Sequence, residues 1–165
     1  MSPIQRTLAL TCLAWAAVPA VLAGQVNVSF VDADGYADAG RSKAERESNL
    51  AALGSHLSSL GQRLPADTVL DIEVLEVDLA GIVRPSRRGT GDLRIARGGA
   101  DWPRMVLRYS LVKGGQVSKA DTERIADMNY STYSSTDSTN PLRYEKRMLD
   151  NWFRDRFVDP VAATR

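Results

Sequence analysis

The sequence predicts an α+β fold: a mainly antiparallel sheet of four to five strands with two amphipathic helices packed on one face. Three observations lead to this prediction. Short segments of alternating apolar and polar residues follow one another through the middle of the chain. Two helical stretches stand apart from these segments, and no internal repeat divides the chain. Because such an order is typical of α+β proteins, we expect residues 24–165 to form a single domain.

A strand and a helix are expected first. Residues 25–31 alternate apolar and polar side chains, which is the pattern of a half-buried strand. The Ser-x-x-Glu segment at 42–45 has the form of a capping box, which satisfies free backbone N–H groups at a helix start. Leucines at steps of three and four then predict a helix that ends at Gly61 and Pro65. These leucines are Leu50, Leu53, Leu57, Leu60 and Leu64.

The clearest strand is TVLDIEVLEVDL, residues 68–79. Its alternation slips by one residue near the middle, which indicates a β-bulge that returns four acids to one face. The acids are Asp71, Glu73, Glu76 and Asp78. Hard cations bind several oxygens, so a cation site is one interpretation of this acidic row. We favour a solvated face whose acids pair with arginines on neighbouring strands. These arginines are Arg94, Arg104 and Arg108.

Further strands are expected at 92–97 and 104–113, with a glycine turn after the second. The segment 120–130 fits either a strand or a helical turn. Asn140 and Pro141 predict a helix start, since Asn caps a helix and Pro suits its first turn. We expect this helix to run to about Val158 and to close the core with its apolar stripe.

Five polar side chains lie near the start of this last helix. They are Asp127, Asn129, Tyr130, Tyr144 and Glu145. They could line a cleft, or they could cap the helix and pin it in place. We favour pinning, because Asp and Asn side chains often bond to nearby backbone at such junctions.

Composition disfavours several classes of function. The chain has 21 Lys and Arg residues against 20 Asp and Glu residues, and general nucleic-acid binders usually carry a basic excess. The arginine-rich segment 84–91 lacks the phosphate-loop pattern and is interpreted as an exposed loop. His56, the single histidine, flanks the leucine stripe and cannot form a conventional zinc site without other ligands. We expect no cofactor, no metal and no catalytic set.

The N-terminus has the layout of a secretory signal peptide. Arg6 precedes an uncharged apolar run that ends in the small-residue pattern Val-Leu-Ala at 21–23. Pro19 interrupts the run, which is short for a membrane span of roughly 20 residues. We therefore predict cleavage after Ala23 and no transmembrane span in the mature chain.

Several stretches together resemble the bacterial domain of unknown function numbered 3016 (DUF3016). The resemblance covers nearly all of the chain after the signal, and the last stretch is its most specific part. It implies a small secreted protein of the Gram-negative periplasm and supplies no activity, cofactor or catalytic residue. The stretches are Val28-Ser-Phe30, VDLAG at 77–81, Pro-x-x-Val-Leu-x-Tyr at 103–109, DMNY at 127–130 and YEKRMLDNWF at 144–153.

These observations favour a non-enzymatic binding or accessory protein whose partner is an unknown envelope protein or ligand. The alternative is a carboxylate-based hydrolase, which a metal could assist, that uses Asp71, Asp78 or Asp127. Carboxylates that converge in a pocket would favour the hydrolase. A flat face of acids paired with arginines would favour the binding protein.

Overall fold

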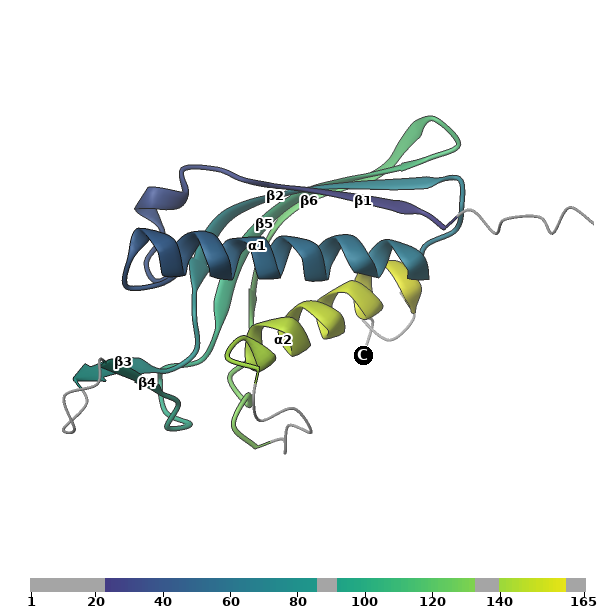
Figure 1. Ribbon diagram of the computed structural model, residues 1–165. Helices are drawn as coiled ribbons and strands as arrows, with labels where there is room; N and C mark the ends of the chain where they lie inside the picture. Colours follow the sequence, from purple (N-terminus) through teal and green to yellow (C-terminus); the bar gives the residue numbers. More distant parts are fainter. Residues whose placement is uncertain (1–22, 86–91, 133–139, 160–165) are drawn as a thin grey trace, which may run out of the picture.

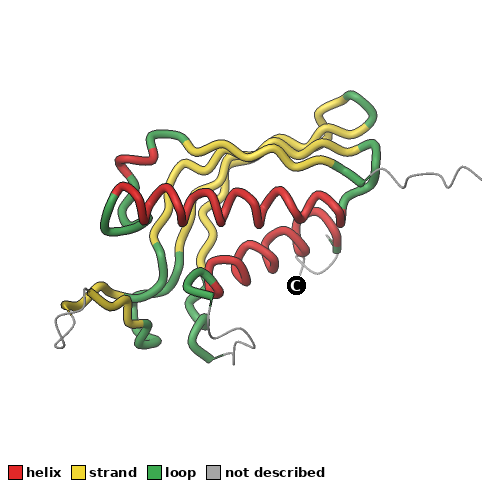
Figure 2. Tube along the Cα trace, in the orientation of Figure 1, coloured by secondary structure: helices red, strands yellow, loops and turns green. Residues whose placement is uncertain are grey.

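The computed structural model describes residues 23–85, 92–132 and 140–159. The predicted signal peptide, apart from Ala23, and residues 86–91 of the arginine-rich segment lie outside this part of the chain. A four-stranded sheet is covered on one face by two helices, and a two-stranded sheet projects from one end (Figure 1). Figure 2 shows both helices on the same side of the strands. The predicted α+β class is confirmed.

The main sheet has the strand order β1-β2-β5-β6. Its strands are β1 (Gln25–Phe30), β2 (Thr68–Asp78), β5 (Arg104–Lys113) and β6 (Gln116–Ala126). β2, β5 and β6 are antiparallel neighbours, whereas β1 runs parallel to β2. Parallel neighbours need a long crossover connection, and helix α1 (Lys43–Ser59) supplies it. The mainly antiparallel sheet is confirmed, with β1 as the exception.

The small sheet consists of β3 (Ile82–Pro85) and β4 (Asp92–Ile95), and we call this pair the arm. Among the described strands, β4 pairs with β3 and with no strand of the main sheet. The prediction that Arg94 lies on a strand beside the acidic row is therefore wrong. The chain turns out of the main sheet directly after β2, so the next two strands pair with each other instead.

The predicted bulge lies in the middle of β2. The pairing with β5 jumps from Val74–Leu107 to Glu76–Val106, which leaves Leu75 without a partner residue. Side chains on both sides of the bulge remain buried on the helix-covered face: Leu70, Ile72, Val74 and Val77. The four acids of the row alternate with them, so they lie on the opposite face, as predicted.

Helix α1 begins as the sequence indicates, because Ser42 Oγ accepts the backbone N–H of Glu45 at 3.1 Å. The capping box is only half formed, since the Glu45 carboxylate accepts the N–H of Arg41 instead of that of Ser42. His56, on the border of the leucine stripe, lies 3.0 Å from Asp150 of the second helix. This contact between His56 and Asp150 joins α1 to the last helix.

The last helix, α2 (Arg143–Phe153), continues as a π-helical turn, η3 (Arg154–Val158). It begins slightly later than predicted, with Asn140 Oδ1 accepting the N–H of Leu142 at 3.0 Å. None of the helices in the described part of the chain is long and apolar enough to cross a membrane.

The core fills the space between the sheet and the two helices. Fully buried side chains come from every layer: Leu53 and Leu57 of α1, Ile72 and Leu107 of the sheet, and Leu149 and Phe153 of α2. Trp152 adds an aromatic cluster, with its ring centroid 5.7 Å from that of Tyr109 and 5.3 Å from that of Phe157. The predicted role of α2 in closing the core is consistent with this packing.

A carboxylate of the edge strand joins this cluster. Glu123 of β6 accepts the Tyr109 hydroxyl at 2.8 Å and Trp152 Nε1 at 3.2 Å. Arg156 Nε lies 2.9 Å from the same carboxylate. We call these four residues the Glu123 cluster, and it ties β5, β6, α2 and η3 together.

Candidate functional site

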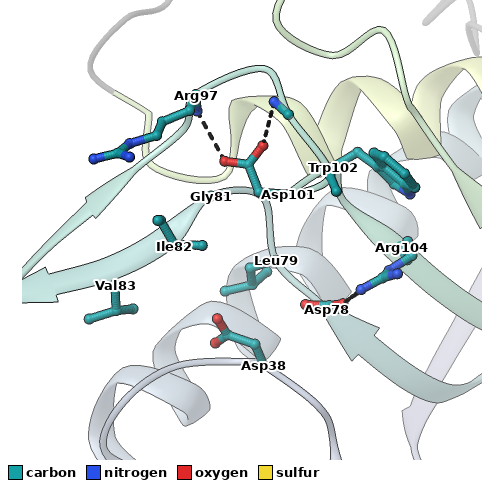
Figure 3. A pocket seen from close by; sticks show the side chains of 12 residues that line it. Asp38, Asp78, Leu79, Gly81, Ile82, Val83, Arg97, Asp101, Trp102 and Arg104 are labelled. Carbon is teal, nitrogen blue, oxygen red and sulfur yellow. Dashed lines mark hydrogen bonds and ion pairs between the residues drawn. The ribbon is translucent and has the colours of Figure 1, made fainter.

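A groove of about 670 Å³ lies where the arm leaves the main sheet. Figure 3 shows its walls, which come from the end of β2, the start of β3 and the loop before β5. The apolar lining side chains are those of Leu79, Ile82, Val83, Ala100 and Trp102. The charged lining residues are Asp38, Asp78, Asp101, Arg97 and Arg104. Apolar surface with a few convergent polar groups is typical of ligand sites.

Gly81 makes the sharp turn from β2 into the arm. Its backbone φ of +85° is rarely adopted by residues that carry a side chain, and an added Cβ would lie 2.8 Å from the carbonyl oxygen of Ile95. Its N–H donates to the carbonyl of Asp101 at 2.8 Å. This glycine therefore brings the arm and the loop before β5 against each other and opens the groove between them.

Asp38 fastens the arm to the main sheet. Its carboxylate receives both terminal nitrogens of Arg94 from β4, each at 2.8 Å. Such a two-point pair is both strong and directional. The backbone of Asp38 also bonds to β2, with its N–H 3.1 Å from the Val77 carbonyl and its carbonyl 3.0 Å from the Leu79 N–H. The arm is thus held to the end of the sheet.

The acidic row divides among different partners. Asp78 lines the groove and receives Arg104 Nε at 3.0 Å. Glu73 pairs with Arg108 on the adjacent strand. Asp71 accepts the Asn27 side-chain amide at 2.7 Å, and Glu76 accepts the N–H of Ala37 at 2.6 Å. Two of the three predicted arginine partners do face the row. Within the described residues, no three acidic, histidine or cysteine side chains are arranged to hold a metal ion.

Asp101 shapes the loop that forms the upper wall. One carboxylate oxygen accepts the N–H of Gly99 at 3.0 Å and the Tyr130 hydroxyl at 2.7 Å. The other accepts the N–H of Arg97 at 3.0 Å. Burial opposes ionisation of Asp101, but these hydrogen bonds outweigh it and lower the pKa of the carboxyl below its ordinary value. Asp101 is therefore a fixed anion around which the loop folds.

The predicted polar cluster lies behind this wall. Tyr130 is fully buried, and its ring packs edge-on against Tyr144 with centroids 4.8 Å apart. Arg147 of α2 lies 3.2 Å from the Asp127 carboxylate and also donates to the Tyr130 carbonyl at 2.5 Å. The other Asp127 oxygen accepts the N–H of Asn129 at 3.1 Å. These contacts fix α2 to the segment before it and support the loop of Asp101. The residues of the cluster are not among those that line the groove.

Glu145 is the most unusual member of the cluster. Its side chain is 1% exposed, and Oε1 accepts the N–H of Ala80, next to the Gly81 turn, at 2.7 Å. Oε2 has no hydrogen-bond partner among the described residues. Burial raises the pKa of Glu145, and the Ala80 N–H and the charges of Arg94 and Arg143 oppose that rise only in part. Helix α2 therefore reaches the point where the arm leaves the sheet.

We expect Glu145→Gln to fold at least as stably as the native chain near neutral pH. The amide keeps the acceptor for Ala80 and removes a buried charge, whereas Glu145→Ala leaves that N–H unpaired and costs about 1–3 kcal/mol. Because its folded-state pKa lies above the ordinary value of 4.5, ionisation of Glu145 weakens the native chain as the pH rises above that value. Denaturant melts between pH 4 and pH 8 should show this slope for the native chain and a smaller one for Glu145→Gln. Equal destabilisation by both substitutions would contradict this account.

Sequence reasoning did not find Asp38, Asp101 or Trp102. Asp38 lies in a turn with no periodic pattern, and its partner Arg94 is 56 residues away. Trp102 offered a usable signal, because a large aromatic side chain in a glycine-rich, charged loop belongs to no apolar stripe.

Comparisons with known proteins identify a family and nothing more specific. No curated protein and no solved structure matches the chain. Residues 24–155 match the family described as "Protein of unknown function (DUF3016)", and the chain belongs to that family.

Proposed function

We propose that this protein is an exported, non-enzymatic binding or accessory protein of the cell envelope, and that the groove is its binding site. One observation carries the proposal: each carboxylate of the groove already has fixed partners. Asp38 holds Arg94, Asp78 holds Arg104, and Asp101 holds its own loop. Polar groups fixed in this way present a preorganised surface that recognises a ligand at a small cost in conformational entropy.

The positions of the acids named by the hydrolase hypothesis also support binding. Asp71 bonds to Asn27 on the open face of the sheet, and Asp78 lies in the groove. Asp127 pairs with Arg147 at the start of α2. A carboxylate mechanism needs its acid and base on either side of one substrate bond. These three acids lie in three separate parts of the fold and do not face one substrate bond.

Export through the predicted signal peptide is the second part of the proposal. It is supported by Arg6, the apolar run that follows and the small residues before Gly24. We expect the full chain, expressed in a Gram-negative host, to give a periplasmic protein whose intact mass begins at Gly24. A product that keeps residues 1–23 and stays with the cytoplasmic or membrane fraction would contradict export.

Binding at the groove is tested by affinity capture from envelope fractions with three proteins. The native chain and Asp71→Asn, which changes only the open face of the sheet, should retain the same partner or ligand. Trp102→Ala, which removes the groove's aromatic wall, should lose it. Retention by Trp102→Ala at the native level would show that the binding surface lies elsewhere.

A further inference from the structure

Trp102 is placed for contact with a ligand. Of the two tryptophans in the described residues, Trp152 belongs to the hydrophobic core and Trp102 does not. Trp102 is only half-buried and lines the groove, with the guanidinium of Arg104 6.0 Å from its ring centroid. A partly exposed indole outside the core provides a large, rigid apolar surface for binding.

The charges around the groove balance. Three carboxylates, those of Asp38, Asp78 and Asp101, lie in the groove, and the guanidinium groups of three arginines lie in or beside it. These are Arg97 and Arg104 in the lining and Arg94 directly behind it, bound to Asp38. A polyanion would meet the three carboxylates, and a cation would meet the three guanidinium groups, so each would suffer like-charge repulsion. The groove is therefore matched to a ligand without net charge.

At the groove floor the remaining hydrogen-bonding capacity belongs to side chains, because a carboxylate oxygen that already accepts one hydrogen bond can accept a second. Backbone groups that an extended peptide would use are already paired at the groove floor: the Leu79 N–H with the Asp38 carbonyl, and the Gly81 N–H with the Asp101 carbonyl. Recognition of a peptide as an added strand depends on unpaired backbone edges, and these two N–H groups of the floor do not provide one. Forked carboxylate and guanidinium groups instead offer paired acceptors and donors.

We propose that the groove binds a neutral saccharide of the cell envelope. The hydroxyl groups of a sugar both donate and accept, so neighbouring hydroxyls can bond to the Asp and Arg forks, and the C–H face of the ring can stack on Trp102. The volume of about 670 Å³ accommodates a short oligosaccharide and lies within the range of about 300–1,000 Å³ usual for small-ligand sites. The inference rests on the proposed function, because it names the ligand of the same groove.

Direct titration with defined oligosaccharides tests the inference. Chitotetraose, cellotetraose and maltotetraose are added separately to the protein purified from expression of the full chain, with tryptophan fluorescence and calorimetry as readouts. We expect saturable binding of at least one of them with a change in tryptophan emission. Trp102→Ala should weaken it at least tenfold, and Trp102→Phe, which keeps an aromatic ring, should weaken it less. Asp71→Asn should bind like the native chain.

The negative outcomes separate this inference from the proposed function. Absence of a response to all three sugars up to millimolar concentration would overturn the saccharide assignment. So would an equal response to inorganic phosphate, which would indicate an anion site. If envelope capture still depends on Trp102 in either case, the groove remains a binding site for another ligand class. If capture does not depend on Trp102 either, both proposals fail. A melting temperature of Trp102→Ala close to the native value would show that lost binding is not lost folding.

Discussion

Replacing Trp152 by alanine is expected to destabilise the protein by about 3–5 kcal/mol, the cost usual for removing a large aromatic side chain from a core. Trp152 is 7% exposed and packs edge-on against Tyr109 and Phe157. Its indole N–H also bonds to Glu123. The substitution thus leaves a cavity between α2 and the sheet and removes a hydrogen bond at once. Urea or guanidinium unfolding curves, followed by circular dichroism, measure the effect.

The chain supplies a matched control for this substitution. Trp102→Ala removes the same side chain from a half-buried position outside the core and should change the unfolding midpoint far less. If the two variants have equal stability, or if the unfolding curve of Trp152→Ala is unchanged, α2 does not close the core as described.

Glu123→Gln is expected to cost about 2 kcal/mol near neutral pH, because it removes the charge that holds Arg156 and weakens two further hydrogen bonds. Burial opposes ionisation of Glu123, but the contacts from Arg156, Tyr109 and Trp152 outweigh it and lower its pKa. A carboxyl with a lowered folded-state pKa stabilises the protein above the ordinary value of 4.5, and this contribution disappears as the pH falls. The native chain should therefore lose stability on acidification more steeply than Glu123→Gln.

An exposed pair provides the comparison. Glu73 and Arg108 form an ion pair on the open face, with side chains 42% and 54% exposed. Solvent screens such pairs, so Glu73→Gln should cost less than about 1 kcal/mol. Denaturant unfolding of both variants from pH 3 to pH 7 measures the two losses of stability. A cost for Glu123→Gln no larger than for Glu73→Gln would show that the Glu123 cluster is not a stabilising junction.

Local patterns predicted most of the fold correctly. The leucine stripe correctly predicted α1, and the slip in alternation correctly predicted the bulge of β2. The arginines at polar positions of β5 do pair with acids of β2. Each of these features depends on residues a few positions apart or on adjacent strands, so the periodicity of the sequence reveals it.

Features set by tertiary structure were missed. β6 was ambiguous because it is an edge strand with exposed residues along nearly its whole length, so no apolar alternation marks it. The Asp38–Arg94 pair joins a turn to the arm, and the contact of Glu145 with Ala80 joins residues 65 positions apart. The sequence places Glu145 among the polar side chains near the start of the last helix, but only the packing of α2 shows that it meets the Gly81 turn.

The bulge also determines where this chain tolerates a change in length. Leu75 is the one extra residue of β2 relative to β5, and the pairing resumes with Glu76 opposite Val106. A deletion of Leu75 would join two halves that are already in phase, so every core side chain would keep its face. It would, however, remove the bend that directs the end of β2, and with it Asp78, toward the groove. A chain shortened by this residue would keep its folded core and lose the shape of its groove.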